Sequence, residues 1–127
     1  MISVHDNEVV SYEVNLKDHY IVINTEYREI EVKIRFTEVM AHLFEDHLHG
    51  SILLDIDNHE IDQFIEGNIE ILEKHKPYCW PAYYKTISEL REKLIKEQYK
   101  YYVIYSSYGF NGWVIAKDIQ ILKSEAT

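Results

Sequence analysis

Histidine and acidic side chains are concentrated between residues 42 and 59, and they are the groups in this chain best suited to chemistry. The group consists of His42, Asp46, His47, His49, Asp55, Asp57 and His59, of which His42, His47, His49, Asp55 and His59 are the candidate metal ligands. Imidazole and carboxylate groups bind zinc and other transition metals. If residues 42–49 are helical, His42 and His49 share a face with Asp46 between them. If they are extended, His47 and His49 share a face instead. The spacing matches no standard metal motif, so a polar loop or sheet edge is the competing interpretation.

Two further groupings could support catalysis. Acid–base hydrolysis needs two carboxyl groups held in a cleft with separated pKa values. The available carboxyl groups are Asp55, Asp57, Glu60 and Asp62. Asp57 and Glu60 are explained more simply as a helix N-cap and its capping-box partner. Cys79 could act as a nucleophile with His75, but a cysteine beside a tryptophan is more often a packed, small apolar residue. We therefore predict that the chain is not an enzyme and needs no cofactor.

The composition is typical of one soluble domain spanning residues 1–127. Hydrophobic residues make up 46% of the chain and charged residues 28%, which is close to a globular average. A single cysteine rules out an internal disulfide and suits a reducing compartment. The first residues lack the basic and apolar regions of a signal peptide, and no apolar run approaches the ~20 residues that cross a bilayer. We expect a cytoplasmic protein.

The charge balance favours a basic protein partner over nucleic acid or an anionic membrane. There are 13 basic and 22 acidic residues, for a formal net charge of −9. Binding to nucleic acid depends on Lys and Arg that neutralise phosphates, so we predict no nucleic-acid partner and no membrane partner. A negative field can steer a basic protein toward the chain. The competing interpretation is that the acidity serves solubility alone.

Aromatic residues are the candidates for a contact surface. The chain has 11 Tyr, 4 Phe and 2 Trp, and large amphipathic rings are favoured anchors in protein interfaces. The candidate partner-binding residues are Tyr78, Trp80, Tyr84, Tyr105 and Trp113. The same rings are also good sheet residues that pack against helices, so core packing is the alternative at each position.

Hydrophobic periodicity predicts an α+β fold. Alternating apolar and polar residues predict an N-terminal meander of three strands, a short middle strand and a C-terminal hairpin. Helical spacing with N-cap signals at Asp57 and Thr86 predicts two helices packed on one face of the antiparallel sheet. The predicted strands are 10–17, 19–26, 29–36 and 51–56, and the predicted helices are 58–75 and 86–98. Residues 36–48 fit either a helix or a bulged continuation of the sheet, with a slight preference for sheet.

The C-terminal hairpin is predicted around Asn111-Gly112, the dipeptide typical of a two-residue β-turn. This turn pairs Tyr102 with Ile121 and places one apolar face toward the core. That face consists of Tyr102, Ile104, Tyr108, Ile115, Ile119 and Ile121. A shift of one residue in the pairing would exchange the two faces.

Four short blocks resemble a family of small, uncharacterised proteins of bacilli and their relatives. The blocks are VMAHLFE (39–45), GSILLDI (50–56), WP (80–81) and YYVIYSSYGFNGWVIAKD (101–118). Genes of this family are often associated with polymorphic-toxin loci. The resemblance therefore implies an immunity protein, that is, a small cytoplasmic protein that binds a cognate toxin and blocks it.

Two functions follow from these observations. The first is a non-enzymatic protein-binding protein that occludes a basic toxin domain, with acidic residues that speed encounter and aromatic anchors. The alternative is a metal-dependent enzyme or metal-binding module that uses residues 42–59. Neither the identity of a partner nor the oligomeric state follows from the sequence.

Overall fold

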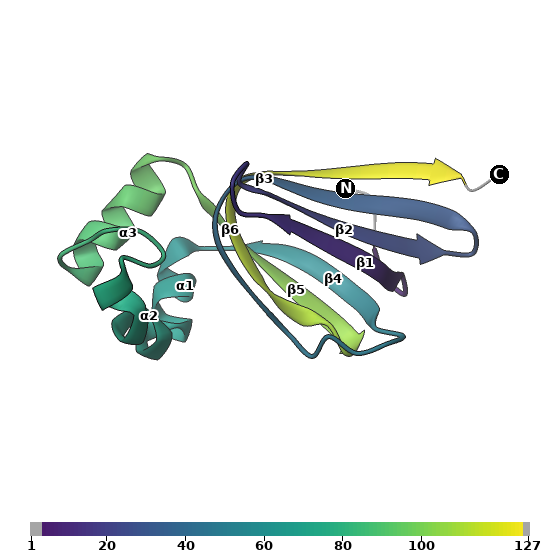
Figure 1. The fold of residues 1–127 in the computed structure, drawn as a ribbon, viewed down its shortest axis with the longest axis horizontal. Helices are drawn as coiled ribbons and strands as arrows, with labels where there is room; N and C mark the ends of the chain where they lie inside the picture. The colour runs from purple at the N-terminus through teal and green to yellow at the C-terminus, as the bar shows by residue number, and fades with distance from the viewer. Residues whose placement is uncertain (1–3, 126–127) are drawn as a thin grey trace.

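The computed structural model describes residues 4–125, which form a six-stranded antiparallel barrel with three α-helices beside it (Figure 1). Around the barrel the strands follow the order β1-β2-β3-β6-β5-β4. The elements are β1 (Glu8–Asn15), β2 (Tyr20–Tyr27), β3 (Ile30–Glu45), β4 (Ile52–His59), α1 (Ile61–Gly67), α2 (Ile69–His75), the 3₁₀ turn η1 (Lys76–Tyr78), α3 (Ile87–Lys96), β5 (Lys100–Tyr108) and β6 (Asn111–Glu125). No helix among these residues is both long and apolar enough to span a membrane.

The N-terminal meander is present as predicted, because β1, β2 and β3 pair in sequence order. Residues 36–48 mostly continue the sheet, since β3 runs on to Glu45 instead of ending near Phe36. The α+β class is therefore compatible with the structure. The predicted details differ, because the sheet closes into a barrel and there are three α-helices, instead of two, within residues 4–125.

The first predicted helix is divided and begins later than expected. Asp57 is not its N-cap, because Asp57 pairs with Val103 within β4. The capping box is formed by Glu60 and Gln63 instead. At Asn68 the backbone leaves helical geometry, with φ −129° and ψ 20°, so α1 ends and α2 begins there. Thr86 caps α3 as predicted, and its hydroxyl oxygen accepts the Glu89 N–H at 3.2 Å.

The predicted hairpin register is wrong. Tyr102 pairs with Val114, and Asn111-Gly112 forms the first two residues of β6 instead of the turn. The chain turns just before it, where Gly109 adopts a φ of +76°. Gly112 lies opposite Phe44, where a Cβ atom would collide with the carbonyl oxygen of Leu43. Gly112 is therefore required because β3 and β6 approach each other closely here. The same Asn-Gly dipeptide is typical of a turn, so the sequence does not distinguish the two roles.

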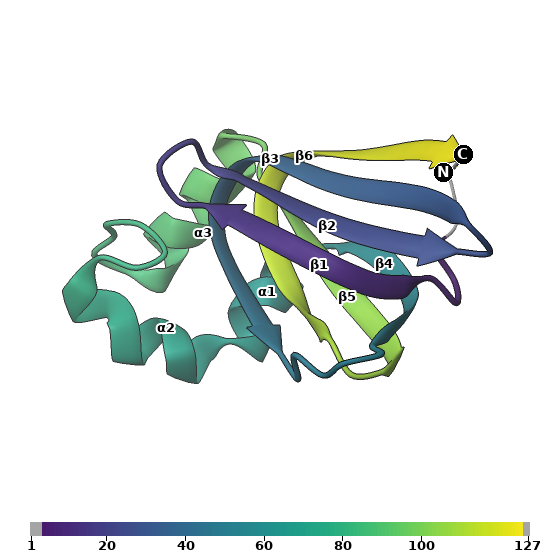
Figure 2. The ribbon, with the colours of Figure 1, turned by 45° about the vertical axis from the view of Figure 1, so that its right-hand side comes forward.

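The two longest strands bend together and join the two sides of the barrel. β3 and β6 are paired from Ile30 to Glu45, and the register of the ladder shifts between Val39 and Ala41, close to Glu38, which has a φ of 53°. Before the bend Ile34 and Phe36 face the barrel interior, whereas beyond it Ala41 faces the helices. Figures 1 and 2 show β3 and β6 curving from the β1–β2 side to the β4–β5 side.

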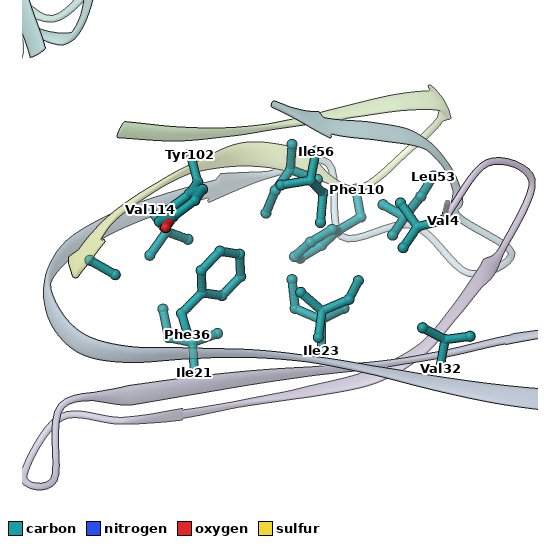
Figure 3. Close-up of a cluster of buried hydrophobic side chains, with 13 residues drawn as sticks. Val4, Ile21, Ile23, Val32, Phe36, Leu53, Ile56, Tyr102, Phe110 and Val114 are labelled. Carbon is teal, nitrogen blue, oxygen red and sulfur yellow. The ribbon is translucent and has the colours of Figure 1, made fainter. Parts of the chain in front are cut away.

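The described part of the chain has two hydrophobic cores, one on each face of the bent sheet. The barrel core contains Phe36, Tyr102 and Phe110, whose rings point into the space between the strands (Figure 3). The helix core contains Phe64, Leu72, Leu90, Leu94, Trp113 and Ile115. Residues 113–116 of β6 contribute to both, because Val114 and Ala116 face the barrel core. A strand buried on both faces is apolar throughout, which explains why these residues do not alternate.

Trp113 should be among the most sensitive core positions. Its side chain is 6% exposed and packs edge-on against Phe64 with ring centroids 5.0 Å apart. We expect Trp113→Ala to lower the free energy of unfolding by ~3 kcal/mol or more, measured by urea denaturation. Trp113→Phe should be much milder, because the buried indole N–H has no hydrogen-bond partner among residues 4–125 and phenylalanine removes it. A loss under ~1 kcal/mol for the alanine variant would contradict this assignment.

Gly112 and Gly50 form a matched pair for testing the β3–β6 ladder. Both have positive φ, but a Cβ atom at Gly50 has no heavy atom within 4 Å. Gly50→Ala should therefore lower the free energy of unfolding only through backbone strain, by about 1 kcal/mol. Gly112→Ala should lower the free energy of unfolding by ~3 kcal/mol or more, because the backbones of β3 and β6 must separate. Equal losses in thermal or urea denaturation would contradict the close approach.

Candidate functional site

The predicted metal ligands do not come together. His42 lies on β3, His47 and His49 lie in the β3–β4 loop, and Asp55 and His59 lie on β4. His59 Nε2 is hydrogen-bonded to the Tyr105 hydroxyl of the neighbouring strand β5 at 2.8 Å, so this ring nitrogen already has a partner. Within residues 4–125, no group of three or more His, Cys, Asp or Glu is placed to hold a metal ion.

Of the other candidate catalytic groups, Asp62 and His75 contact neighbouring side chains, whereas Cys79 is exposed. Asp62 forms an ion pair with Arg91 of α3, and this contact lowers the pKa of the Asp62 carboxyl group. Cys79 is exposed at the end of η1 with a φ of 58°, so the interpretation of this cysteine as a packed apolar residue is wrong. The His75 ring packs against Trp80, with centroids 5.5 Å apart.

The five candidate partner-binding aromatics divide into exposed and buried positions. Tyr78 is 79% exposed and Tyr105 is 39% exposed, so both reach the surface. Trp80 is half-buried against Trp113. Tyr84 is buried in the helix core and its hydroxyl donates to the Leu72 carbonyl at 3.2 Å. Tyr84 and Trp113 therefore lie in the helix core, because helix packing removes their rings from the surface.

An open seam between β1 and β4 provides a surface groove that the sequence did not indicate. The two strands are paired only at Glu8 and Ile52 in the described chain. A bulge between Val9 and Ser11 then bends β1, as such bulges do. Past this point lies a groove of about 530 Å³ between β1 and the loop that leads to β4. The groove is lined by Glu8, Val9, Val10, Ser11, Tyr12, His47, Leu48, His49, Gly50, Ser51 and Phe110. We call it the seam groove.

Aromatic rings form one wall of the seam groove. Tyr12 is 39% exposed, and its ring lies 5.0 Å from that of Phe110 and 5.5 Å from that of Phe44. The His47 ring stacks on Tyr12 at 5.6 Å, and its Nδ1 is hydrogen-bonded to the Tyr12 hydroxyl at 2.7 Å. Each ring is thus held by at least one other, so this wall is ordered without a ligand.

Ser51 holds the loop side of the seam groove in place. Its hydroxyl donates to the Leu48 carbonyl at 2.6 Å and accepts the Phe110 N–H at 2.9 Å. One buried side chain therefore ties the β3–β4 loop to the β5–β6 turn. Gly109 lies so close that a Cβ there would collide with this serine. The position of the β3–β4 loop in the groove is therefore fixed by its contacts with the β5–β6 turn.

All of the net negative charge lies in one segment of the chain. Residues 36–73, which we call the acidic segment, contain ten acidic residues and no Lys or Arg, for a charge of −10. The rest of the chain has 13 basic and 12 acidic residues, for a charge of +1. The ten are Glu38, Glu45, Asp46, Asp55, Asp57, Glu60, Asp62, Glu66, Glu70 and Glu73, and each is exposed. A charge count in a sliding window would have found this segment.

The acidic segment borders the seam groove. It includes the end of β3, the β3–β4 loop, β4, α1 and α2, and it supplies His47, Leu48 and His49 to the groove. The end of β3, the loop, α1 and α2 lie along the lower side of the molecule in both views (Figures 1 and 2). The structure thus combines a carboxylate-rich surface with an adjoining aromatic groove. This combination suits recognition of a basic, partly apolar partner.

Comparison with known proteins found no family model that matches the chain and no curated protein with significant similarity to it.

His42 should make stability depend on pH. Burial lowers the pKa of its imidazole from the ordinary value of 6.5, so the unfolded chain takes up the proton first as the pH falls. The free energy of unfolding should therefore decrease as the pH drops through 6.5. We expect His42→Gln to flatten this dependence, measured by urea denaturation between about pH 7.5 and about pH 5.5. Parallel pH profiles for the two proteins would show that His42 does not contribute.

Proposed function

We propose that this chain is a non-enzymatic protein-binding protein that recognises a basic partner and blocks it by covering its surface. The observation that carries the proposal is the acidic segment, with ten exposed carboxyl groups and no Lys or Arg, beside the seam groove. The charge asymmetry supports a directed interaction more than general solubility, since solubility does not require one segment to hold the whole net charge.

The two parts of the surface have different physical roles. Carboxylates attract a basic partner over several ångströms and raise the association rate, with an effect that salt screens. The aromatic wall of the groove supplies apolar area that can be buried on contact, and partly exposed Tyr12 is its most accessible ring. Tyr78 and Tyr105 are further exposed rings outside the groove.

The resemblance to proteins from polymorphic-toxin loci suggests the class of partner to test first. Toxin domains of this kind are blocked in the producing cell by immunity proteins, and we infer the same role here. The first experiment is co-expression and co-purification with the product of the neighbouring gene. Failure of that product to bind, together with failure of every basic domain encoded at the locus, would refute the immunity role.

The contribution of the acidic segment can be isolated with two variants of equal net charge. Asp55→Asn, Glu66→Gln and Glu70→Gln together remove three charges from the segment. Glu26→Gln, Glu29→Gln and Glu31→Gln remove three exposed charges from the β2–β3 turn and the strand ends beside it. Using the co-purified partner, we expect the first variant to slow association about fivefold at low salt, and the second to change it less than about twofold. Equal effects in surface plasmon resonance would mean that net charge alone matters.

A further inference from the structure

The outer edge of β1 is the feature with the least explained role. β1 pairs with β2 from Glu8 to Asn15 on one side. On its other side, the Val9 N–H donates to the Ser51 carbonyl at 2.8 Å, and the pairing with β4 is confined to Glu8 and Ile52. Among the described residues, residues 10–15 therefore have no paired strand on that edge. An unpaired edge presents N–H and C=O groups that can pair with another strand.

Space for another strand exists beside this edge. The seam groove, of about 530 Å³, runs along the first half of the free edge, and Val10, Ser11 and Tyr12 form its β1 side. The bulge between Val9 and Ser11 turns β1 away from β4 and opens this space. Because Phe110 is only 2% exposed and Ser51 is buried, the groove rests on packed residues.

The lining of the groove specifies the side chains of an added strand. Tyr12 lies opposite Ile23, a residue of the barrel core, so residues of the added strand on that face would meet the Tyr12 and Phe110 rings. On the other face of β1, Glu13 is exposed and accepts the Tyr20 hydroxyl at 2.6 Å. The lining contains Glu8 and no Lys or Arg. Alternate residues of the added strand should therefore be apolar and basic.

We propose that the free edge of β1 accepts an extended segment of a partner protein as an added β-strand, with alternating apolar and basic side chains. This inference rests on the proposed function and defines how the partner is held. Main-chain hydrogen bonds would supply affinity, and the aromatic wall and carboxylates would supply selectivity, as in other cases of strand addition. A second copy of this chain is a poorer occupant, because edge-to-edge pairing would bring the Glu8 and Glu13 carboxylates of two copies together.

Three synthetic peptides test this inference on the intact protein. The parent is an end-blocked peptide of eight alternating Lys and Val residues, and its two isomers are N-methylated either at every Val or at every Lys. Each isomer lacks the N–H donors of one edge but keeps the charge and the side chains. Strand addition uses one edge only, so one isomer should bind at least about tenfold more weakly than the parent and the other about as well. Amide hydrogen exchange should slow at residues 10–15 when the parent binds.

Tyr12 and Tyr27 provide a matched pair of protein variants. Their side chains are 39% and 38% exposed, but only Tyr12 lines the groove. Tyr12→Ser should weaken binding of the parent peptide about fivefold or more, whereas Tyr27→Ser should change it less than about twofold. Thermal unfolding verifies that both variants are folded, and the peptide comparison on the unmodified protein does not depend on either.

Several results would overturn the inference. Equal affinities of the two isomers, or no binding of the parent at about 1 mM, would exclude strand addition. A dimer that the parent peptide dissociates would assign the edge to a second copy. If the two isomers bind with equal affinity and the acidic-segment triple variant weakens that binding, the proposed function would stand and only strand addition would be refuted. If the two isomers bind unequally and the acidic-segment triple variant does not weaken binding, strand addition would stand and the proposed role of the acidic segment would be refuted.

Discussion

The rest of the structure depends on the ladder between β3 and β6. These two strands remain paired from Ile30 to Glu45 while they bend near Glu38, so each belongs to both sides of the barrel. The bend carries the β4–β5 pair over the β1–β2–β3 meander and encloses the barrel core. It also turns the outer face of β6 toward the helices. Close contact at Gly112 and Leu43 is what permits the ladder to continue beyond the bend.

The barrel closes through one short contact, and this gives the molecule its most distinctive surface. Once β1 is bent by its bulge, the strands on either side of the seam diverge and leave Tyr12 accessible although it lies on the inward face. The loop that bridges the seam belongs to the acidic segment, so the carboxylates and the aromatic surface lie next to each other. The proposed recognition of a basic partner draws on both properties, since charge governs encounter and the aromatic surface supplies contact area.

Prediction from the sequence succeeded where a pattern has a single physical cause. Clean alternation in residues 29–36 reflects a strand with one buried face, and the Thr86 cap satisfies an orphan N–H of α3. It failed at Asn111-Gly112, because glycine serves both tight turns and close strand contacts. In the site, Tyr78 and Tyr105 do reach the surface, whereas Trp113 and Tyr84 fill a second core that exists only because the helices cover the outer face of the sheet.

The sequence by itself determined the elements governed by local interactions: the alternating strands, the capped helix α3 and the amount of negative charge. Tertiary structure alone decided which strands are neighbours, which aromatic rings are covered and where the barrel stays open. The physical reason is that pairing between β3 and β6 joins residues up to 95 positions apart, such as Ile30 and Glu125. Such pairing depends on the fit of backbones and side chains across the whole barrel, which no local pattern encodes.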